Sequence, residues 1–209
     1  MRPLSRMSTV MRPALFVREG FTLRDGRKIV LRPIDRSDAP KLIDLHDHLS
    51  PESQYFRFFG PKPKLAPSEA EYLASVDFHN RFAIVAEISE DKEKHLVGVG
   101  RFDINEPGVA ESAIVVRDDY QGVGLGTAIL TRMREVARGR GLHAFVAEIL
   151  AENAKMIDLL AANGLEVSAA RDGIVRILAP IETPVLFKGF EIVARATETI
   201  LEKRPRLRR

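Results

Sequence analysis

The 209-residue chain contains no cysteine, which excludes disulfides, thiolate metal sites and cysteine nucleophiles. It also has no run of about 18 apolar residues, so we expect no membrane-spanning helix and a cytoplasmic protein. The Gly-x-Ser-x-Gly and His-Glu-x-x-His patterns of hydrolases are absent as well. With 45% hydrophobic residues, the chain has the composition of a folded domain, and we expect no metal site.

Positive charge is concentrated at the two ends of the chain. Residues 1–19 carry four arginines against one glutamate, and residues 203–209 carry five lysines and arginines. The whole chain has a net charge of +3, so residues 20–202 are net negative. An acidic body does not favour nucleic acid as a partner, and we interpret both basic ends as flexible arms.

The pattern of turn residues and apolar spacing predicts an α+β fold. Asp25-Gly26 separates two short apolar segments and favours a hairpin. Short turns join the next three strand-like segments, which indicates an antiparallel meander. Strands are expected near residues 21–23, 28–31, 82–86, 96–102, 110–116, 144–149, 165–169 and 174–179, and helices after the caps Ser37, Ser50 and Ser68, from Leu125 to Gly139, and over 154–162 and 187–202.

A loop with three glycines at alternate positions lies between a predicted strand and a predicted helix. Its residues are Gln121, Gly122, Val123, Gly124, Leu125, Gly126 and Thr127. Glycines allow a ligand to approach the backbone, and the unpaired N–H groups and dipole of a helix N-terminus favour an anion. We therefore interpret the loop as a phosphate cradle. It lacks the Gly-Lys-Ser/Thr ending of a Walker loop, and the preceding meander argues against a dinucleotide-binding fold.

These motifs resemble the GNAT superfamily of N-acetyltransferases. Residues 116–126 resemble its acetyl-CoA signature, and residues 152–165 resemble a later block in which an asparagine begins a helix. Residues 31–34, 49–60 and 97–101 are similar to the catalytic domain of bacterial Pat-type protein lysine acetyltransferases. The resemblance implies a GNAT fold: a mixed, mostly antiparallel sheet of about seven strands flanked by helices, with an N-terminal hairpin strand and an extra C-terminal helix.

The resemblance also divides the chain and implies its chemistry. A basic arm covers residues 1–19, the acetyltransferase domain covers 20–182, and a helix with a basic tail covers 183–209. The implied reaction is direct transfer of an acetyl group from acetyl-CoA to an amine in a ternary complex, with a protein lysine as the expected acceptor. Because neutralising a lysine at pH 7 costs about 4.6 kcal/mol, a positioned base is needed.

Site residues follow from the same resemblance. Glu111 matches the glutamate of the Pat-type pattern and is the candidate base, whereas Glu87 and Glu148 are strand carboxylates that match no family position. Leu160 stands where many relatives have a tyrosine acid, so no general acid is assigned. The implied acetyl-CoA contacts are the amides of residues 121–127 to the pyrophosphate, Asn153 near the pantetheine, and the backbone groups of Ile114, Val115 and Val116 along the pantetheine arm.

The sequence leaves alternatives open. A small-molecule amine is an alternative acceptor, and a non-catalytic acyl-CoA-binding module is an alternative class. Residues 187–202 are compatible with a helix that covers the site, mediates a homodimer or only packs. The aromatic residues after Ser50 are assigned to the hydrophobic core: Tyr55, Phe56, Phe58 and Phe59.

Overall fold

The computed structural model describes residues 18–90, 92–154, 156–157 and 166–181. They form one eight-stranded sheet in the order β1-β2-β3-β4-β5-β6-β8-β7. All neighbouring strands are antiparallel except β5 and β6, which are parallel. The strands are β1 Glu19–Thr22, β2 Lys28–Pro33, β3 Arg81–Glu90, β4 Glu93–Glu106, β5 Val109–Val116, β6 Ala144–Leu150, β7 Glu166–Val167 and β8 Ile174–Pro180.

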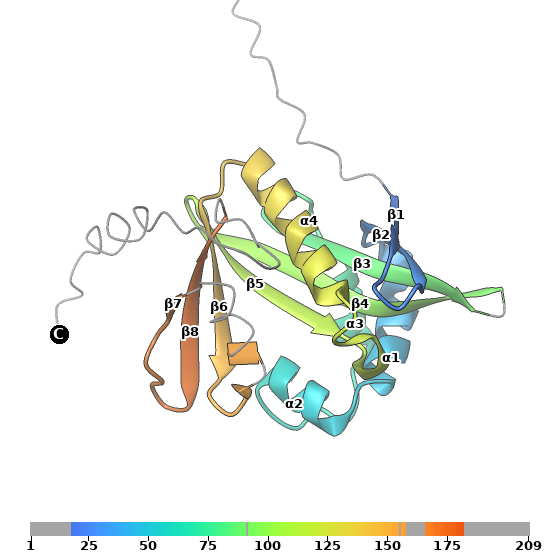
Figure 1. Cartoon of the computed structure of the whole chain (residues 1–209), viewed down its shortest axis with the longest axis horizontal. Coiled ribbons are helices and arrows are strands. Elements are labelled where there is room, and N and C mark those ends of the chain that lie inside the picture. Colours follow the sequence, from blue (N-terminus) through green and yellow to red (C-terminus); the bar gives the residue numbers. More distant parts are fainter. Residues whose placement is uncertain (1–17, 91, 155, 158–165, 182–209) are drawn as a thin grey trace, which may run out of the picture.

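Helices cover both faces of the sheet (Figure 1). Along β3, Ile84 faces the core beneath α4, whereas Val85 faces the core beneath α1 and α3. The helices are η1 Arg36–Asp38, α1 Ala39–Asp47, α2 Pro51–Phe58, α3 Pro67–Ala74, η2 Asp118–Tyr120 and α4 Leu125–Gly139. No described helix is long and apolar enough to cross a membrane.

Two glycines of β4 let α4 approach the sheet closely. A Cβ atom added to Gly100 would lie 2.3 Å from Ile129 Cγ2 and 2.5 Å from Met133 Sδ, and one added to Gly98 would lie 3.0 Å from Ile129 Cδ1. Side chains at these positions would displace the helix. The glycines of β4 therefore set the distance between α4 and the sheet. This distance in turn determines the position of the loop that precedes the helix.

The structure confirms the expected fold. The antiparallel meander, the hairpin at Asp25-Gly26 and the long helix α4 are present. Ser37 is not a helix cap, because Asp35 caps η1 and Asp38 precedes α1. The expected cap Ser68 is likewise inside α3, whose capping carboxylate is that of Glu69. The expected helix at 187–202, the basic C-terminal tail, residues 1–17 of the N-terminal arm and most of the helix at 154–162 lie outside the described residues. The last two residues of that arm are part of the fold, because Glu19 begins β1 and Arg18 pairs with Glu87.

Candidate active site

Strands β5 and β6 form a fork. They pair only at Val109↔Ala144, Ala110↔Phe145 and Glu111↔Val146, so beyond Glu111 the strand β5 has no β6 partner. On its other side β5 remains paired with β4 as far as Val116↔Gly98. The fork is therefore closed at Glu111 and open towards the end of β5.

The β4–β5 register decides which backbone groups face the fork. The N–H of Arg117 donates to the carbonyl of Val97 at 3.0 Å, which makes this a hydrogen-bonded pair of the ladder. Such pairs alternate along an antiparallel ladder, so Val115 bonds to β4 while Ile114 and Val116 direct their N–H and C=O groups towards the fork. The carbonyl of Val116 accepts a hydrogen bond from Gln121 Nε2 at 3.1 Å, consistent with this direction.

The glycine loop follows the open end of the fork. Gly122 has φ = 73° and Gly124 has φ = 98°, conformations that strain any residue with a Cβ atom. Among the described residues, no acceptor receives a hydrogen bond from the backbone N–H groups of residues 122–127. The first intrahelical bond of α4 runs from Ala128 N–H to the Gly124 carbonyl at 3.1 Å. The loop thus presents a series of N–H groups at the positive end of α4's dipole.

The β1–β2 hairpin contributes arginines that sequence reasoning missed. Arg24 N–H donates to the Val123 carbonyl at 3.1 Å, and the Arg24 side chain lies 3.6 Å from where a Cβ of Gly124 would be. Arg27 places its guanidinium 3.7 Å from the centre of the Tyr120 ring and donates to the Asp119 carbonyl at 2.8 Å. The hairpin is about 100 residues from the loop in sequence, so no local motif signals that they meet.

Asp118 ties helix α2 to the segment that precedes the loop. Its carboxylate accepts hydrogen bonds from Ser50 N–H at 2.9 Å, Ser50 Oγ at 2.7 Å and Ser53 Oγ at 2.8 Å. Burial alone would raise the pKa of Asp118, but the bonds from Ser50 and Ser53 hold it below its usual value. Ser50 Oγ also caps α2 by accepting from Ser53 N–H. This explains why a Ser-x-x-Ser spacing begins α2.

Glu111, the candidate base, lies at the closed end of the fork. Its side chain is exposed and accepts a hydrogen bond from Asn105 Nδ2 at 3.2 Å. Because side chains alternate along a strand, Glu111 is on the same face of β5 as Ala113 and Val115. A carboxylate in this position is accessible to an acceptor that enters on the α1–α3 side of the sheet.

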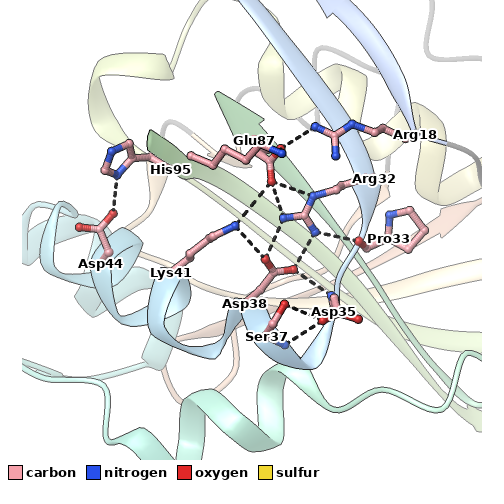
Figure 2. A network of polar contacts seen from close by, with 11 residues as sticks. Arg18, Arg32, Pro33, Asp35, Ser37, Asp38, Lys41, Asp44, Glu87 and His95 are labelled. Carbon is pink, nitrogen blue, oxygen red and sulfur yellow. Dashed lines mark hydrogen bonds and ion pairs between the residues drawn. The ribbon is translucent and has the colours of Figure 1, made fainter. Parts of the chain in front are cut away.

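The alternative carboxylate Glu87 has a structural role. It is 3% exposed and accepts from Arg32 Nη2 at 2.6 Å and from Arg18 Nη2 at 2.7 Å, while Arg32 also binds Asp38 at 2.7 and 2.8 Å (Figure 2). Burial would raise the pKa of Glu87, but Arg32 keeps it below its usual value. Glu148 is an exposed residue of β6 opposite Arg176, on the β6 arm of the fork two residues past the pair Glu111↔Val146. Glu87 lies outside the fork, on β3.

A cavity of about 40 Å³ lies beside the fork, on the face of the sheet covered by α1 and α3. Two of its residues are arginines, Arg57 of α2 and Arg101 of β4, and a third is the buried His46 of α1. Helix α2 has no fully buried residue, and Phe59 is 42% exposed. The expectation that these aromatic residues form core holds in part: Phe58 packs against the core beneath α1 and α3, whereas Phe59 is exposed and α2 borders the cavity. The remaining lining residues are Leu42, Leu45, Leu49, Phe58, Leu65, Leu73, Val99, Ala113 and Val115.

Asn153 follows β6, where the predicted helix begins. Its Oδ1 accepts a hydrogen bond from Met156 N–H at 3.1 Å, so it is a helix N-cap. Its N–H donates to the Leu150 carbonyl at 2.9 Å. Residues 154, 156 and 157 are helical. Among the described residues there is no group of three or more His, Asp or Glu side chains arranged to hold a metal.

Comparisons with known proteins agree with this geometry. A family model described as Acetyltransferase (GNAT) domain matches residues 28–166. An acetyltransferase of Pseudomonas aeruginosa is 33% identical over 144 residues, which cover 68% of this chain and 77% of that protein. Acetyltransferase Pat of Mycolicibacterium smegmatis is 30% identical over 136 residues, which are 64% of this chain but 40% of Pat. The crystal structure of the GNAT domain of S. lividans PAT superposes with a TM-score of 0.71 at 32% identity, covering 78% of this chain and 96% of that domain.

Proposed function

This chain belongs to the GNAT family of acetyltransferases, and on that premise we propose that it transfers an acetyl group from acetyl-CoA to a primary amine with Glu111 as the base. The observation that carries the proposal is the fork between β5 and β6. Its closed end holds the accessible carboxylate of Glu111, and its open end leads to the glycine loop. An acyl donor and a proton acceptor can therefore meet at one point.

The described residues fit acetyl-CoA along its length. The N–H groups of residues 122–127 and the dipole of α4 suit the two phosphates of the pyrophosphate, and Arg24 adds positive charge beside Gly124. The backbone groups of Ile114 and Val116 that face the fork suit the amides of the pantetheine arm. Val115 lies between them, and Asn153 lies just beyond β6, on the other arm of the fork. When bound, acetyl-CoA supplies an acetyl group already activated as a thioester.

Glu111 accepts a proton from the attacking amine, directly or through one water. The amine nitrogen bonds to the carbonyl carbon of the acetyl group, and the carbon–sulfur bond then breaks. The departing sulfur takes up one proton, so the products are an N-acetyl amine and a free thiol. The N–H of Val116 faces the fork and is suited to donate to the carbonyl oxygen as negative charge develops there.

A protein lysine is the acceptor that the Pat-type motifs favour. The similarity to the GNAT domain of S. lividans PAT covers 78% of this chain and 96% of that domain. A small-molecule amine is the second candidate. The observation that favours it is the cavity beside the fork, which is lined by side chains of α1, α2 and α3.

Replacement of Glu111 by Gln tests the base. The change keeps the size and polarity of the side chain and removes its ability to accept a proton. We expect the rate of acetyl transfer to a lysine peptide at pH 7 to fall roughly 10²–10⁴-fold. The thermal shift caused by acetyl-CoA should stay as in the wild type. Because the chain has no cysteine, all free thiol in the assay comes from the reaction.

Glu93→Gln is the matched control, since Glu93 is another exposed strand glutamate and lies at the start of β4, before the part of that strand that pairs with β5. It should keep the wild-type rate. A Glu111→Gln enzyme with undiminished turnover would remove Glu111 from the mechanism. If acetyl-CoA binds but no amine is acetylated by the wild type, the chain is a binding module. Gly124→Ala places a Cβ atom on a residue at φ = 98° and should weaken acetyl-CoA binding. It leaves the carboxylate of Glu111 in place to accept a proton.

A further inference from the structure

The cavity beside the fork holds two arginines without a carboxylate partner. Among the described residues, Arg57 makes no hydrogen bond or ion pair, and Arg101 makes one hydrogen bond, from Nη2 to the Leu73 carbonyl at 3.0 Å. Arg101 is 9% exposed. Burial and the nearby positive charge of Arg57 lower the pKa of Arg101 to about 10, so it is still a cation at neutral pH. Two cations thus face one small space.

The cavity is also lined by His46, a buried side chain without a hydrogen-bond partner among the described residues. It is 2% exposed, and neither ring nitrogen has a hydrogen-bond partner among the described residues. Its Nδ1 lies 3.6 Å from Asp47 Oδ1, while its ring packs 5.5 Å from that of Phe58. A buried polar group without a partner costs about 1–3 kcal/mol. A ligand in the cavity would supply the missing partner.

The size of the cavity restricts what that ligand is. About 10–15 Å³ holds one water, so the 40 Å³ here corresponds to about three non-hydrogen atoms. That is the size of a single carboxylate group, and guanidinium groups bind carboxylates with paired hydrogen bonds. Apart from His46, the rest of the lining is leucine, phenylalanine, valine and alanine, an apolar surrounding that strengthens the attraction.

The place of the cavity links it to the reaction. Arg101 is directly opposite Ala113 in the β4–β5 ladder, and Glu111 precedes Ala113 by two residues on the same face. Two residues of a strand span about 7 Å. Burial lowers the pKa of Arg57, while the negative charges of Glu111 and Asp103 act to raise it, so Arg57 lies within electrostatic reach of Glu111.

We infer that Arg57 and Arg101 bind a carboxylate group carried by the amine acceptor, so that this enzyme selects acceptors with a carboxylate close to the amine. The inference rests on the proposed function, since it assigns the acceptor of the same site. Two sources supply this chemistry: a free amino acid, or an acidic residue beside a lysine in a protein. A shallow surface pocket of about 270 Å³ shares Phe58, Leu65 and Leu73 with the cavity and provides adjacent space for the remainder of the acceptor.

Pairs of acceptors that differ only in the carboxylate test the inference. L-methionine is compared with L-methioninamide, and the end-blocked peptide Ala-Lys-Glu-Ala with Ala-Lys-Gln-Ala. Thiol release is measured for the wild type, Arg57→Met and Arg101→Met. In at least one pair we expect the wild type to prefer the carboxylate by tenfold or more in kcat/KM, and both variants to prefer it by less than twofold. The pair that shows the preference identifies the source.

Arg36→Met is the matched control, because Arg36 is an exposed arginine of η1 outside the cavity. It should keep the wild-type preference. Binding is measured separately by the thermal shift that sodium acetate causes relative to sodium chloride, without acetyl-CoA. A shift in the wild type that disappears in Arg101→Met supports the cavity even if no acceptor is acetylated. Equal use of carboxylate and amide, or no acetate shift in the wild type, overturns the inference while leaving acetyl transfer intact.

Discussion

The same face of the sheet buries arginines in two opposite ways. Arg32 on β2 is enclosed by carboxylates, with Asp38 at 2.7 Å and Glu87 at 2.6 Å (Figure 2). Arg57 of α2 and Arg101 of β4 have no carboxylate within ion-pair distance among the described residues. The pKa of Arg32 is raised by its hydrogen bonds to Asp38 despite burial, whereas that of Arg101 is lowered by burial. The first arrangement stabilises the fold, and the second leaves positive charge for a ligand.

Among the substitutions that test this comparison, Arg32→Met should cause the largest change in the free energy of unfolding. Arg32→Met leaves Asp38 and Glu87, which are 1% and 3% exposed, without their main partner. Breaking a buried pair by removing one partner typically costs about 3–5 kcal/mol. We expect a loss of this size in the free energy of unfolding, measured by urea denaturation at pH 7. A loss below about 1 kcal/mol would show that the network behaves like a surface salt bridge.

A fall in pH should reduce the stability contributed by the carboxylates around Arg32. It should not change the charge of the two arginines in the cavity. The pKa values of Asp38 and Glu87 are both below their usual values: burial alone would raise them, but the hydrogen bonds and charge of Arg32 prevail. Their stabilising contribution is therefore complete above the unfolded carboxyl pKa of about 4 and is lost as the pH falls through the lower folded values.

Urea denaturation between pH 3 and 7 checks this direction. The wild type should lose stability below about pH 4, and Asp38→Asn should lose less over the same interval because one of the two carboxylates no longer titrates. Arg101→Met should follow the wild-type profile, since arginine stays protonated throughout. Parallel profiles for wild type and Asp38→Asn would contradict the assignment.

Replacement of Arg101 by methionine should not lower the free energy of unfolding, in contrast to replacement of Arg32. It removes a buried cation with one hydrogen bond and fills the space with an apolar side chain of similar length. We expect the free energy of unfolding without ligand to stay constant or to rise by about 1 kcal/mol, in line with the stability often gained when a binding residue is removed. A loss of several kcal/mol would mean that Arg101 is structural, like Arg32.

Lys94 provides the smallest expected effect. Its Nζ is 3.5 Å from Glu87 Oε1, but its side chain is 50% exposed. Exposed ion pairs contribute about 0–1 kcal/mol, so Lys94→Ala should change the free energy of unfolding by less than about 0.5 kcal/mol. The same urea measurement applies. An effect near that of Arg32→Met would show that proximity to Glu87, rather than burial, determines the energy.

Local sequence features were sufficient to predict the meander and the loop. The glycine turn and helix α4 follow from backbone requirements that particular residues satisfy, such as positive φ at Gly122 and Gly124. The helix caps were predicted less well. Ser37 and Asp35 are both capping residues by type, and only the fold of the Arg32–Asp38 network selects Asp35.

The arginine cavity could not be predicted from sequence. Arg57 and Arg101 are 44 positions apart, and each resembles an ordinary surface arginine in its own segment. The strand pattern places Arg101 on the α1 face only once the β4–β5 register is known. The aromatic residues of α2 indicated a core helix, and Phe58 does pack against the core, but no residue of α2 is fully buried and the helix borders a cavity. The burial of each arginine depends on which helices and strands pack against it, and the sequence of a single segment does not contain that information.

The attachment of α2 to Asp118 has a consequence for how mutants of this site are interpreted. One carboxylate holds the first turn of the helix that carries Arg57, and it also precedes the turn whose amides lead into α4. Gln121 extends the same chain of bonds from Ser53 to the Val116 carbonyl. Substitution of Asp118 would shift both substrates' apparent affinities together. Such joint changes would arise because Asp118 holds both α2 and the segment before the glycine loop in position. They would not by themselves indicate that Asp118 contacts either substrate.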